Sequence, residues 1–271
     1  MVKNDKSGPF PLGERERGAF HPLARAAARI LICLAAVLSP AAALRAGPPF
    51  FTDDPEPVDF RHWEFYAASA QTGSRLDFSG TAPHFEVNYG LAPGAMFHLI
   101  AGASFDLPRH GRLRYGLGDM EIGLKYRFVD ETKGRPMIGT FPHVEIPTGS
   151  ASRGLGAGYV HAFFPIWLQK SWGPWTTYGG GGYWINPGPG NKDYWWFGWE
   201  AQRDLSKSVT VGGEVFAATS SAEGESTIAA FNLGAMISLG QGSQLLLSAG
   251  RDFRGPETFY GYIAYYLTFG P

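Results

Sequence analysis

Apolar and polar residues alternate with a period of two over most of the chain after residue 61. In the clearest segment, residues 119–128, every even position is apolar and the odd positions carry Asp, Glu, Gly, Lys and Arg. Such alternation is typical of β-strands with one apolar face, whereas a helix needs a period of about 3.6, which is nowhere sustained. Clusters of Gly, Pro, Asn, Asp and Ser interrupt the pattern in the manner of turns. The sequence therefore predicts an all-β protein built from antiparallel hairpins.

About twelve segments carry this alternation, and most exceed the roughly five to six residues of a typical globular strand. A tilted strand that crosses a bilayer needs about 9–11 residues, a length that these segments reach. Their length favours a membrane protein. The predicted strands are 62–72, 82–91, 95–106, 117–129, 136–147, 157–170, 174–186, 193–204, 208–219, 227–239, 243–253 and 258–269.

The apolar face of these strands can pack against a protein core or against lipid, since both give the same alternation. Aromatic side chains on that face favour lipid, because outer-membrane barrels carry aromatic girdles at the membrane interfaces. The hydrocarbon layer also requires paired backbone groups, so the strands must close into a ring. We therefore predict a single transmembrane antiparallel up-and-down β-barrel of about 12 strands in a Gram-negative outer membrane, with a soluble periplasmic β-sandwich as an alternative. The aromatic residues on the apolar face include Trp63, Phe65, Phe164, Trp195, Phe197, Trp199 and Phe269.

The segment before the alternating region has the order of a secretory signal peptide. Arg25 and Arg29 precede an apolar stretch, which Pro40 and small residues follow. We predict a leader and signal peptide over residues 1–43, a periplasmic N-terminal arm over 44–60 and the outer-membrane barrel over 61–271. The single cysteine, Cys33, lies in the leader, so the mature chain is predicted to hold no disulfide.

Composition and charge limit the classes of partner that the protein can bind. The chain has 23 Lys and Arg against 24 Asp and Glu, a balance that provides no basic field for nucleic acid. The acidic run Asp53, Asp54, Glu56 and Asp59 lacks the spacing of a calcium loop. It predicts a solvated periplasmic arm, or one folded into the barrel mouth. The expected partners are outer-membrane lipid, small solutes and, through the C-terminal strand, the barrel assembly machinery.

The polar parity of the strands is predicted to face the lumen, because a Lys or Arg side chain facing lipid at mid-bilayer costs roughly 2–4 kcal/mol. Solvation alone accounts for that placement. The same groups can also form a polar network that acts as a plug, a gate or a constriction. The polar lumen candidates are His62, Glu64, His84, Glu86, His98, Glu121, Lys125, Arg127, His143, Glu145, His161, Glu200 and Glu214.

Aromatic residues also occupy the lumen parity. They indicate either a partly apolar conduit that contacts small hydrophobic molecules, or rings that fill the bore of a narrow barrel. The aromatic lumen candidates are Tyr66, Tyr159, Phe163, Trp167, Tyr194, Trp196, Phe216, Tyr260 and Tyr262.

No catalytic, cofactor or metal site is predicted. The glycine run in YGGGGYW (178–184) lacks the Lys-Ser/Thr pair and the helix of a phosphate loop, so it predicts a strand bend or close packing. The lipase elbow G-x-S-x-G does not occur. The strand histidines point away from lipid in this assignment, and His110 with Ser104 forms no recognisable constellation. A lipid-modifying enzyme is the least favoured alternative.

Three segments resemble a known family. PPFFTDDPEPVDFRHWEFY (48–66), GLGDMEIGLKYRF (116–128) and VEIPTG (144–149) are similar to bacterial outer-membrane barrels known as transporters or as the phenol-degradation meta-pathway family. The resemblance implies an outer-membrane channel for hydrophobic or aromatic small molecules, and it carries over no catalytic residues. The last strand resembles the assembly signal of such barrels, although Gly270 and Pro271 follow its terminal Phe269.

Together these observations predict a monomeric, passive outer-membrane channel for small, hydrophobic or aromatic solutes. Its lumen would be both polar and aromatic. The first alternative is a non-transporting structural barrel with a packed lumen, and a test of solute flux separates the two.

Overall fold

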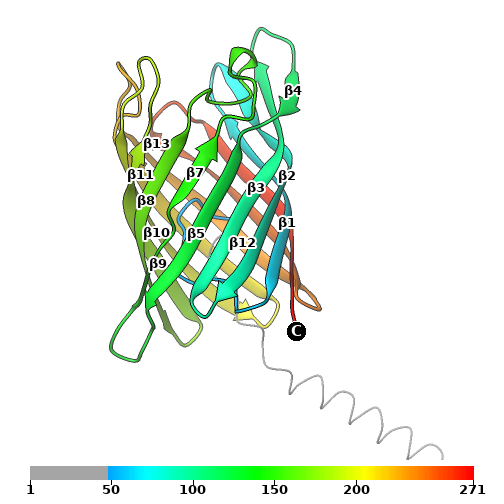
Figure 1. Ribbon diagram of the computed structural model, residues 1–271, viewed down its shortest axis with the longest axis vertical. Helices are drawn as coiled ribbons and strands as arrows, with labels where there is room; N and C mark the ends of the chain where they lie inside the picture. Colours follow the sequence, from blue (N-terminus) through cyan, green and yellow to red (C-terminus); the bar gives the residue numbers. More distant parts are fainter. Residues whose placement is uncertain (1–47) are drawn as a thin grey trace, which may run out of the picture. The chain divides into compact units, whose positions relative to one another are not determined.

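The computed structural model describes residues 48–271, which fold into a closed antiparallel barrel (Figure 1). The predicted signal peptide lies outside the described residues. Within them, the chain forms one 3-10 helix, η1 (Ala151–Arg153), and fourteen strand segments. The strands are β1 (Trp63–Gly73), β2 (Asp77–Ala92), β3 (Ala95–Pro108), β4 (Arg114–Leu117), β5 (Met120–Val129), β6 (Met137–Thr140), β7 (His143–Ile146), β8 (His161–Trp172), β9 (Trp175–Ile185), β10 (Tyr194–Ser206), β11 (Val209–Ala218), β12 (Ile228–Gly240), β13 (Ser243–Arg254) and β14 (Phe259–Phe269).

The fourteen segments make twelve barrel strands, because two strands are interrupted. β3 pairs with both β4 and β5, and β8 pairs with both β6 and β7. Pro142 interrupts the second of these strands, since proline has no N–H for the ladder, although its carbonyl still accepts a hydrogen bond from the Leu124 N–H at 3.0 Å. Pairing of β1 with β14, from Trp63 opposite Phe269 to Gly73 opposite Phe259, closes the ring. The predicted twelve-stranded up-and-down barrel is confirmed.

The apolar parity of the strands faces outward, as predicted. On β5, Leu124 and Tyr126 are each 52% exposed, whereas Lys125 between them is 5% exposed. The same contrast separates Trp199, 49% exposed, from its neighbour Glu200, which is fully buried. A belt of exposed apolar side chains around a closed barrel is stable only against lipid. No helix in the described part of the chain is long and apolar enough to cross a membrane.

The glycine run of β9 packs against rings on the outside of the barrel. A Cβ atom added at Gly179 would lie 2.5 Å from the Trp199 ring, and one added at Gly181 would lie 2.3 Å from the Phe197 ring. Only glycine leaves room for these rings to lie on the neighbouring strand. The run therefore has the packing role that its lack of a phosphate-loop context indicates.

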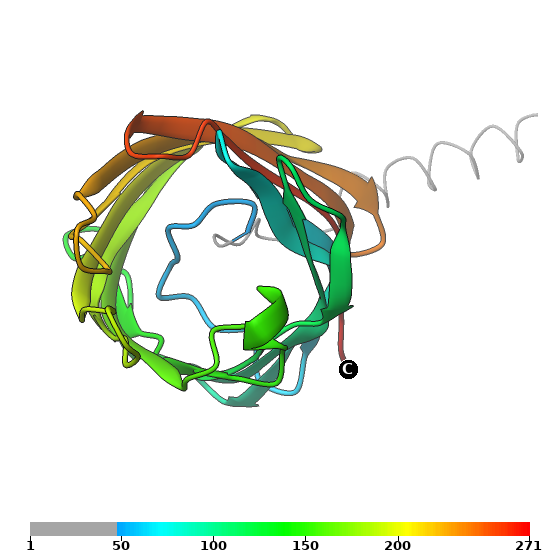
Figure 2. The same cartoon turned by 90° about the horizontal axis from the view of Figure 1, so that it is seen from above.

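The described part of the N-terminal arm, residues 48–60, enters the barrel interior (Figure 2). Thr52 and Asp54 are completely buried, and Val58 is 2% exposed. Of the two positions considered for the arm, the structure shows the one inside the barrel, and the solvated arm is wrong. Burial of Asp53, Asp54 and Glu56 is possible because Lys125 and Gln169 of the wall supply a cation and a hydrogen-bond donor, as described below.

The two ends of the barrel differ. We call the end at which β1 begins and β14 finishes the terminal end, and the opposite one the loop end. Most turns at the terminal end are short, such as residues 93–94 between β2 and β3, although residues 130–136 between β5 and β6 are longer. The longest connection at the loop end, residues 147–160, contains η1 and folds over the mouth, where Leu155 is 2% exposed (Figure 2).

Candidate solute cavity in the barrel lumen

One continuous row of inward-facing positions crosses eight barrel strands in hydrogen-bonding register. It begins near the terminal end at the second residue of β1 and finishes at the loop end on the first residue of β10. The row passes from the terminal end to the loop end because the strands across which its members pair are tilted relative to the barrel axis. Its members, in spatial order, are Glu64, Asn88, His98, Gly123, His143, Phe163, Trp184 and Tyr194. We call this set the lumen row.

The lower part of the lumen row is polar and internally bonded. His98 Nδ1 lies 2.7 Å from Asn88 Oδ1, and His98 Nε2 lies 3.0 Å from Glu121 Oε1. The Asn88 amide donates to Glu86 Oε1 at 2.8 Å. Tyr266 Oη donates to Glu64 Oε1 at 2.9 Å. Because each group is matched by another on the wall, this network is a pre-formed polar surface rather than a set of isolated charges.

The upper part of the lumen row is a stack of rings. The Phe163 and Trp184 ring centroids are 4.8 Å apart with an interplanar angle of 17°, and Trp184 stacks on Tyr194 at 6.0 Å and 14°. His143 joins the polar and aromatic parts, since its ring lies 5.4 Å from Phe163 and its Nε2 lies 4.0 Å from Glu121 Oε2. Offset rings at these separations attract one another beyond their burial. The aromatic part is therefore an ordered surface.

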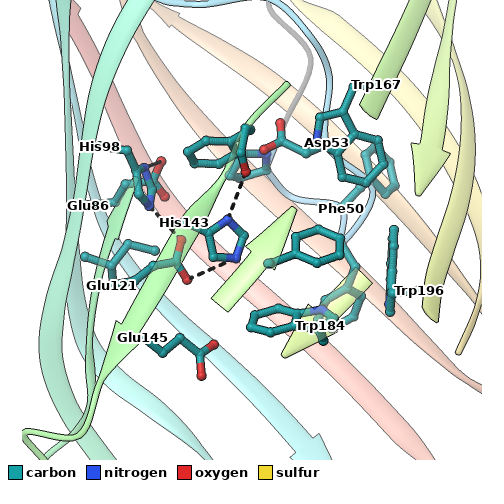
Figure 3. Close-up of a pocket in the computed structure, with 15 residues that line it drawn as sticks. Phe50, Asp53, Glu86, His98, Glu121, His143, Glu145, Trp167, Trp184 and Trp196 are labelled. Atoms are coloured by element: carbon teal, nitrogen blue, oxygen red, sulfur yellow. Dashed lines mark hydrogen bonds and ion pairs between the residues drawn. The ribbon is translucent and has the colours of Figure 1, made fainter. Parts of the chain in front are cut away.

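A cavity of about 340 Å³ lies between the two kinds of wall, with the arm on one side. Figure 3 shows Glu121 and Glu145 facing it from one wall and Trp184 and Trp196 from the other. Its volume is within the range of roughly 300–1,000 Å³ found for small-molecule pockets, which combine apolar walls with a few polar groups. The lining residues are Pro48, Phe50, Phe51, Asp53, Glu86, His98, Ile100, Glu121, Phe141, His143, Glu145, Phe163, Trp167, Trp184 and Trp196.

A second cavity, of about 250 Å³, lies beside the first and reaches the loop end. Phe51 and Trp196 border both cavities. The second cavity is also lined by Tyr194 and by Ser221 and Glu225 of the connection between β11 and β12. The two cavities are thus separated by rings rather than by backbone.

Side chains of four strands, β5, β8, β11 and β13, hold the arm. The Phe51 and Thr52 N–H groups donate to the two Glu214 carboxylate oxygens at 2.9 and 2.7 Å. Lys125 Nζ donates to Asp53 at 2.8 Å and lies 3.6 Å from Asp54. Further bonds join Gln169 Nε2 to Glu56 at 3.1 Å and Ser248 Oγ to the Pro49 carbonyl at 2.7 Å. The arm is therefore a fixed part of the lumen and forms the floor of the cavity.

Asp119 fixes the connection over the loop end. Its two carboxylate oxygens accept the Gly149 N–H at 2.8 Å and the Ala157 N–H at 2.6 Å. Thr148 Oγ1 donates to the Gly118 carbonyl at 2.8 Å. These contacts join GLGD (116–119) to VEIPTG (144–149), two of the segments that carry the family resemblance. Both motifs thus serve to hold the 147–160 connection in place.

The structure brings five of the predicted polar lumen residues to the cavity: Glu86, His98, Glu121, His143 and Glu145. Others face inward elsewhere. Glu214 and Lys125 bind the arm, while His84 Nδ1 lies 2.6 Å from Thr81 Oγ1 and His161 Nδ1 lies 3.5 Å from Glu145. Glu64 and Glu200 are buried in the wall, and Arg127 pairs with Asp130 at the terminal end.

The aromatic predictions divide similarly. Phe163, Trp167 and Trp196 line the cavity, and Tyr194 lines its neighbour together with Phe216 and Tyr260. Tyr66 is buried, and Tyr262 is half-buried on the same inward parity.

Two predicted positions need correction. Tyr159 is 44% exposed and precedes β8 rather than facing the lumen from it, because residues 157–160 belong to the connection that Asp119 holds. His62 precedes β1 and contacts the Phe60 carbonyl at 3.1 Å, so it lies at the rim and not on a strand. In both cases the alternation continues past the point at which the ladder ends.

Seven cavity residues are missing from the predicted set: Pro48, Phe50, Phe51 and Asp53 of the arm, Ile100 of β3, Phe141 beside Pro142, and Trp184 after the glycine run. Tyr194 has the same inward parity as Trp196, and it pairs with Trp184 in the β9–β10 register. That pairing places Trp184 inward as well. Nothing in the local sequence shows that the arm enters the barrel. Within residues 48–271, no group of three or more His, Cys, Asp and Glu side chains is arranged to hold a metal ion.

The closed ring, the apolar belt and the twelve antiparallel strands define an outer-membrane β-barrel. Residues 69–269 match the family described as "Putative MetA-pathway of phenol degradation", and the chain belongs to that family. The resemblance inferred from the three segments is confirmed.

Two solved structures share the fold. The first is the COG4313 outer membrane channel from Pseudomonas putida F1, with a TM-score of 0.64 and 14% identity over 83% of this chain and 100% of that one. The second is the translocator domain of the autotransporter NalP from Neisseria meningitidis, with a TM-score of 0.51 and 11% identity over 92% and 95% of the two chains. No curated protein sequence matched the chain.

Proposed function

We propose that the protein is a passive outer-membrane channel for small apolar or aromatic solutes. The observation that carries this proposal is the lumen row, whose rings run from Tyr194 at the loop end to His143 at the cavity. A solute ring can move between such surfaces by exchanging one stacking contact for the next, without an energy source. The polar part of the row then meets hydroxyl or other polar groups on the solute.

Two comparisons support the proposal without identifying the solute. The solved barrel from Pseudomonas putida is itself an outer membrane channel. The family description refers to phenol degradation, which is consistent with an aromatic solute. In this proposal the arm narrows the terminal end, so a solute leaves past the groups that hold the arm.

The alternative is a structural barrel with a sealed lumen. The observation that favours it is the arm, which is bound to β5, β8, β11 and β13 and lies in the bore beneath the cavity. A channel needs a path past these contacts, whereas a structural barrel does not.

Solute entry into liposomes separates the two functions. Purified protein in liposomes should admit 4-hydroxybenzyl alcohol several-fold faster than erythritol, a polyol of nearly equal mass, after subtraction of the protein-free rate. The preference arises because only the aromatic solute can stack on the lumen row. If both solutes enter protein-containing liposomes no faster than protein-free liposomes, the barrel is sealed.

A matched pair of variants tests the path. Trp184→Ala removes an inward ring of the lumen row, whereas Trp195→Ala removes a ring that is 49% exposed on the outer face. We expect Trp184→Ala to abolish the preference for the aromatic solute and Trp195→Ala to retain it. The same loss in both variants would contradict a route along the row.

A further inference from the structure

The cavity carries an excess of carboxylates. Asp53, Glu86, Glu121 and Glu145 line it, and no Lys or Arg is among the described residues that do so. The nearest lysine, Lys125, is already bound to the arm carboxylates. Among the lining residues themselves, four carboxylates face two histidines, so the lining is acidic even if both histidines carry a positive charge. An anion entering this cavity would therefore be repelled.

Glu145 is the carboxylate most accessible to a solute. Its side chain is 36% exposed, compared with 8% for Glu86 and 21% for Glu121. Glu121 is engaged by His98 at 3.0 Å, whereas the nearest basic atom to Glu145, His161 Nδ1, is 3.5 Å away. Figure 3 shows Glu145 directed toward the cavity below His143. A charged group bound here would displace little existing structure.

Aromatic side chains lie opposite these carboxylates. Trp184, Phe163 and Trp196 form one side of the cavity, and Trp196 lies edge-on to Phe163 with their centroids 6.5 Å apart. Ring faces attract cations through their quadrupole, and indole does so most strongly. A carboxylate facing several rings is the arrangement that binds an ammonium group attached to an apolar body.

We propose that the cavity selects small aromatic cations of the arylalkylammonium class. The ammonium group lies against Glu145 and Glu121, and the solute ring lies among Phe163, Trp184 and Trp196. This rests on the proposed function, which it sharpens by adding a charge preference: cation over neutral isostere, and neutral isostere over anion.

Tryptophan fluorescence of the full mature protein in detergent at pH 8 tests the preference with three monocyclic aromatic probes of similar size. Benzylammonium should bind about tenfold more tightly than benzyl alcohol, in line with a cation–π contact supplemented by a carboxylate. Benzoate should not bind. Equal affinities for benzylammonium and benzyl alcohol would overturn the charge preference while leaving an aromatic channel intact. If none of the three probes binds, and the protein admits solutes into liposomes no faster than the protein-free control, both proposals are wrong.

The variant Glu145→Gln tests whether the carboxylate of Glu145 causes the preference for the cation. It should lower benzylammonium affinity about tenfold and leave benzyl alcohol affinity unchanged, because only the charged contact is lost. Glu145→Asp keeps the charge and should retain the preference. Glu223→Gln makes the same change in net charge at an exposed loop position and should have no effect. A parallel loss of both affinities in a correctly folded Glu145→Gln protein, judged by heat-modifiable electrophoretic mobility, would assign Glu145 a structural role and contradict the proposal.

Discussion

The lower and upper parts of the lumen row share one parity and one register, yet they differ in what their side chains contact. Asn88 and His98 bond to other wall residues. Phe163 and Trp184 contact neighbouring rings and border the cavity. Hydrogen-bonding groups inside a barrel need partners whether or not a solute is present, whereas an aromatic face does not. The polar part therefore stabilises the lumen and faces a solute mainly through His98, whereas the aromatic part remains available to a solute ring.

The largest effect is expected where the polar part holds the arm. Lys125→Met leaves Asp53 and Asp54 without their cation, and breaking a buried ion pair by removing one partner costs about 3–5 kcal/mol. We expect a corresponding fall in the free energy of unfolding in urea and a higher single-channel conductance as the arm loosens. Lys133→Met, at an exposed turn position, is the control. Unchanged stability would show that the arm is not held by this contact.

A smaller effect is expected within the polar network. Glu121→Leu removes the acceptor of His98, and a hydrogen bond to a charged group contributes about 1.5–3 kcal/mol. Conductance or assembly should change more than in Leu124→Ile, which alters a side chain on the outer face that is 52% exposed. Equally small effects of both substitutions would contradict the assigned faces.

The junction of the two parts gives the smallest expected change in stability. Gly123 separates His98 from His143, and an added Cβ would lie 2.7 Å from the Phe141 ring and 2.9 Å from His143 Cβ. Gly123→Ala should cost roughly 1–2 kcal/mol through overpacking and should shift the rings of the upper part. Gly134→Ala, where the added atom meets nothing within 4 Å, should be neutral. Near-ultraviolet circular dichroism and urea unfolding provide the measurements, and identical behaviour of the two variants would show that the junction is not tightly packed.

The alternation of residues was enough to predict the strands, the closed barrel and most inward positions. That is possible because side-chain direction in a strand depends only on position along the local backbone. The same rule fails where a strand ends, as at Tyr159, because alternation in sequence does not show where hydrogen bonding stops. It also gives no information on a segment without a period, such as the arm that carries Phe50 and Asp53 into the lumen.

Which inward residues become neighbours was decided only by the tertiary structure. Asn88 meets His98 across a short turn, but His143 faces Phe163, and Glu64 faces Thr268 at the closure of the ring, through pairings set by register and barrel shear. A shift of two residues in any of these pairings would preserve every inward side chain and still disperse the lumen row. The sequence by itself therefore determined the chemistry of the two faces, and the hydrogen-bonded closure of the barrel assembled that chemistry into a cavity with one polar and one aromatic wall.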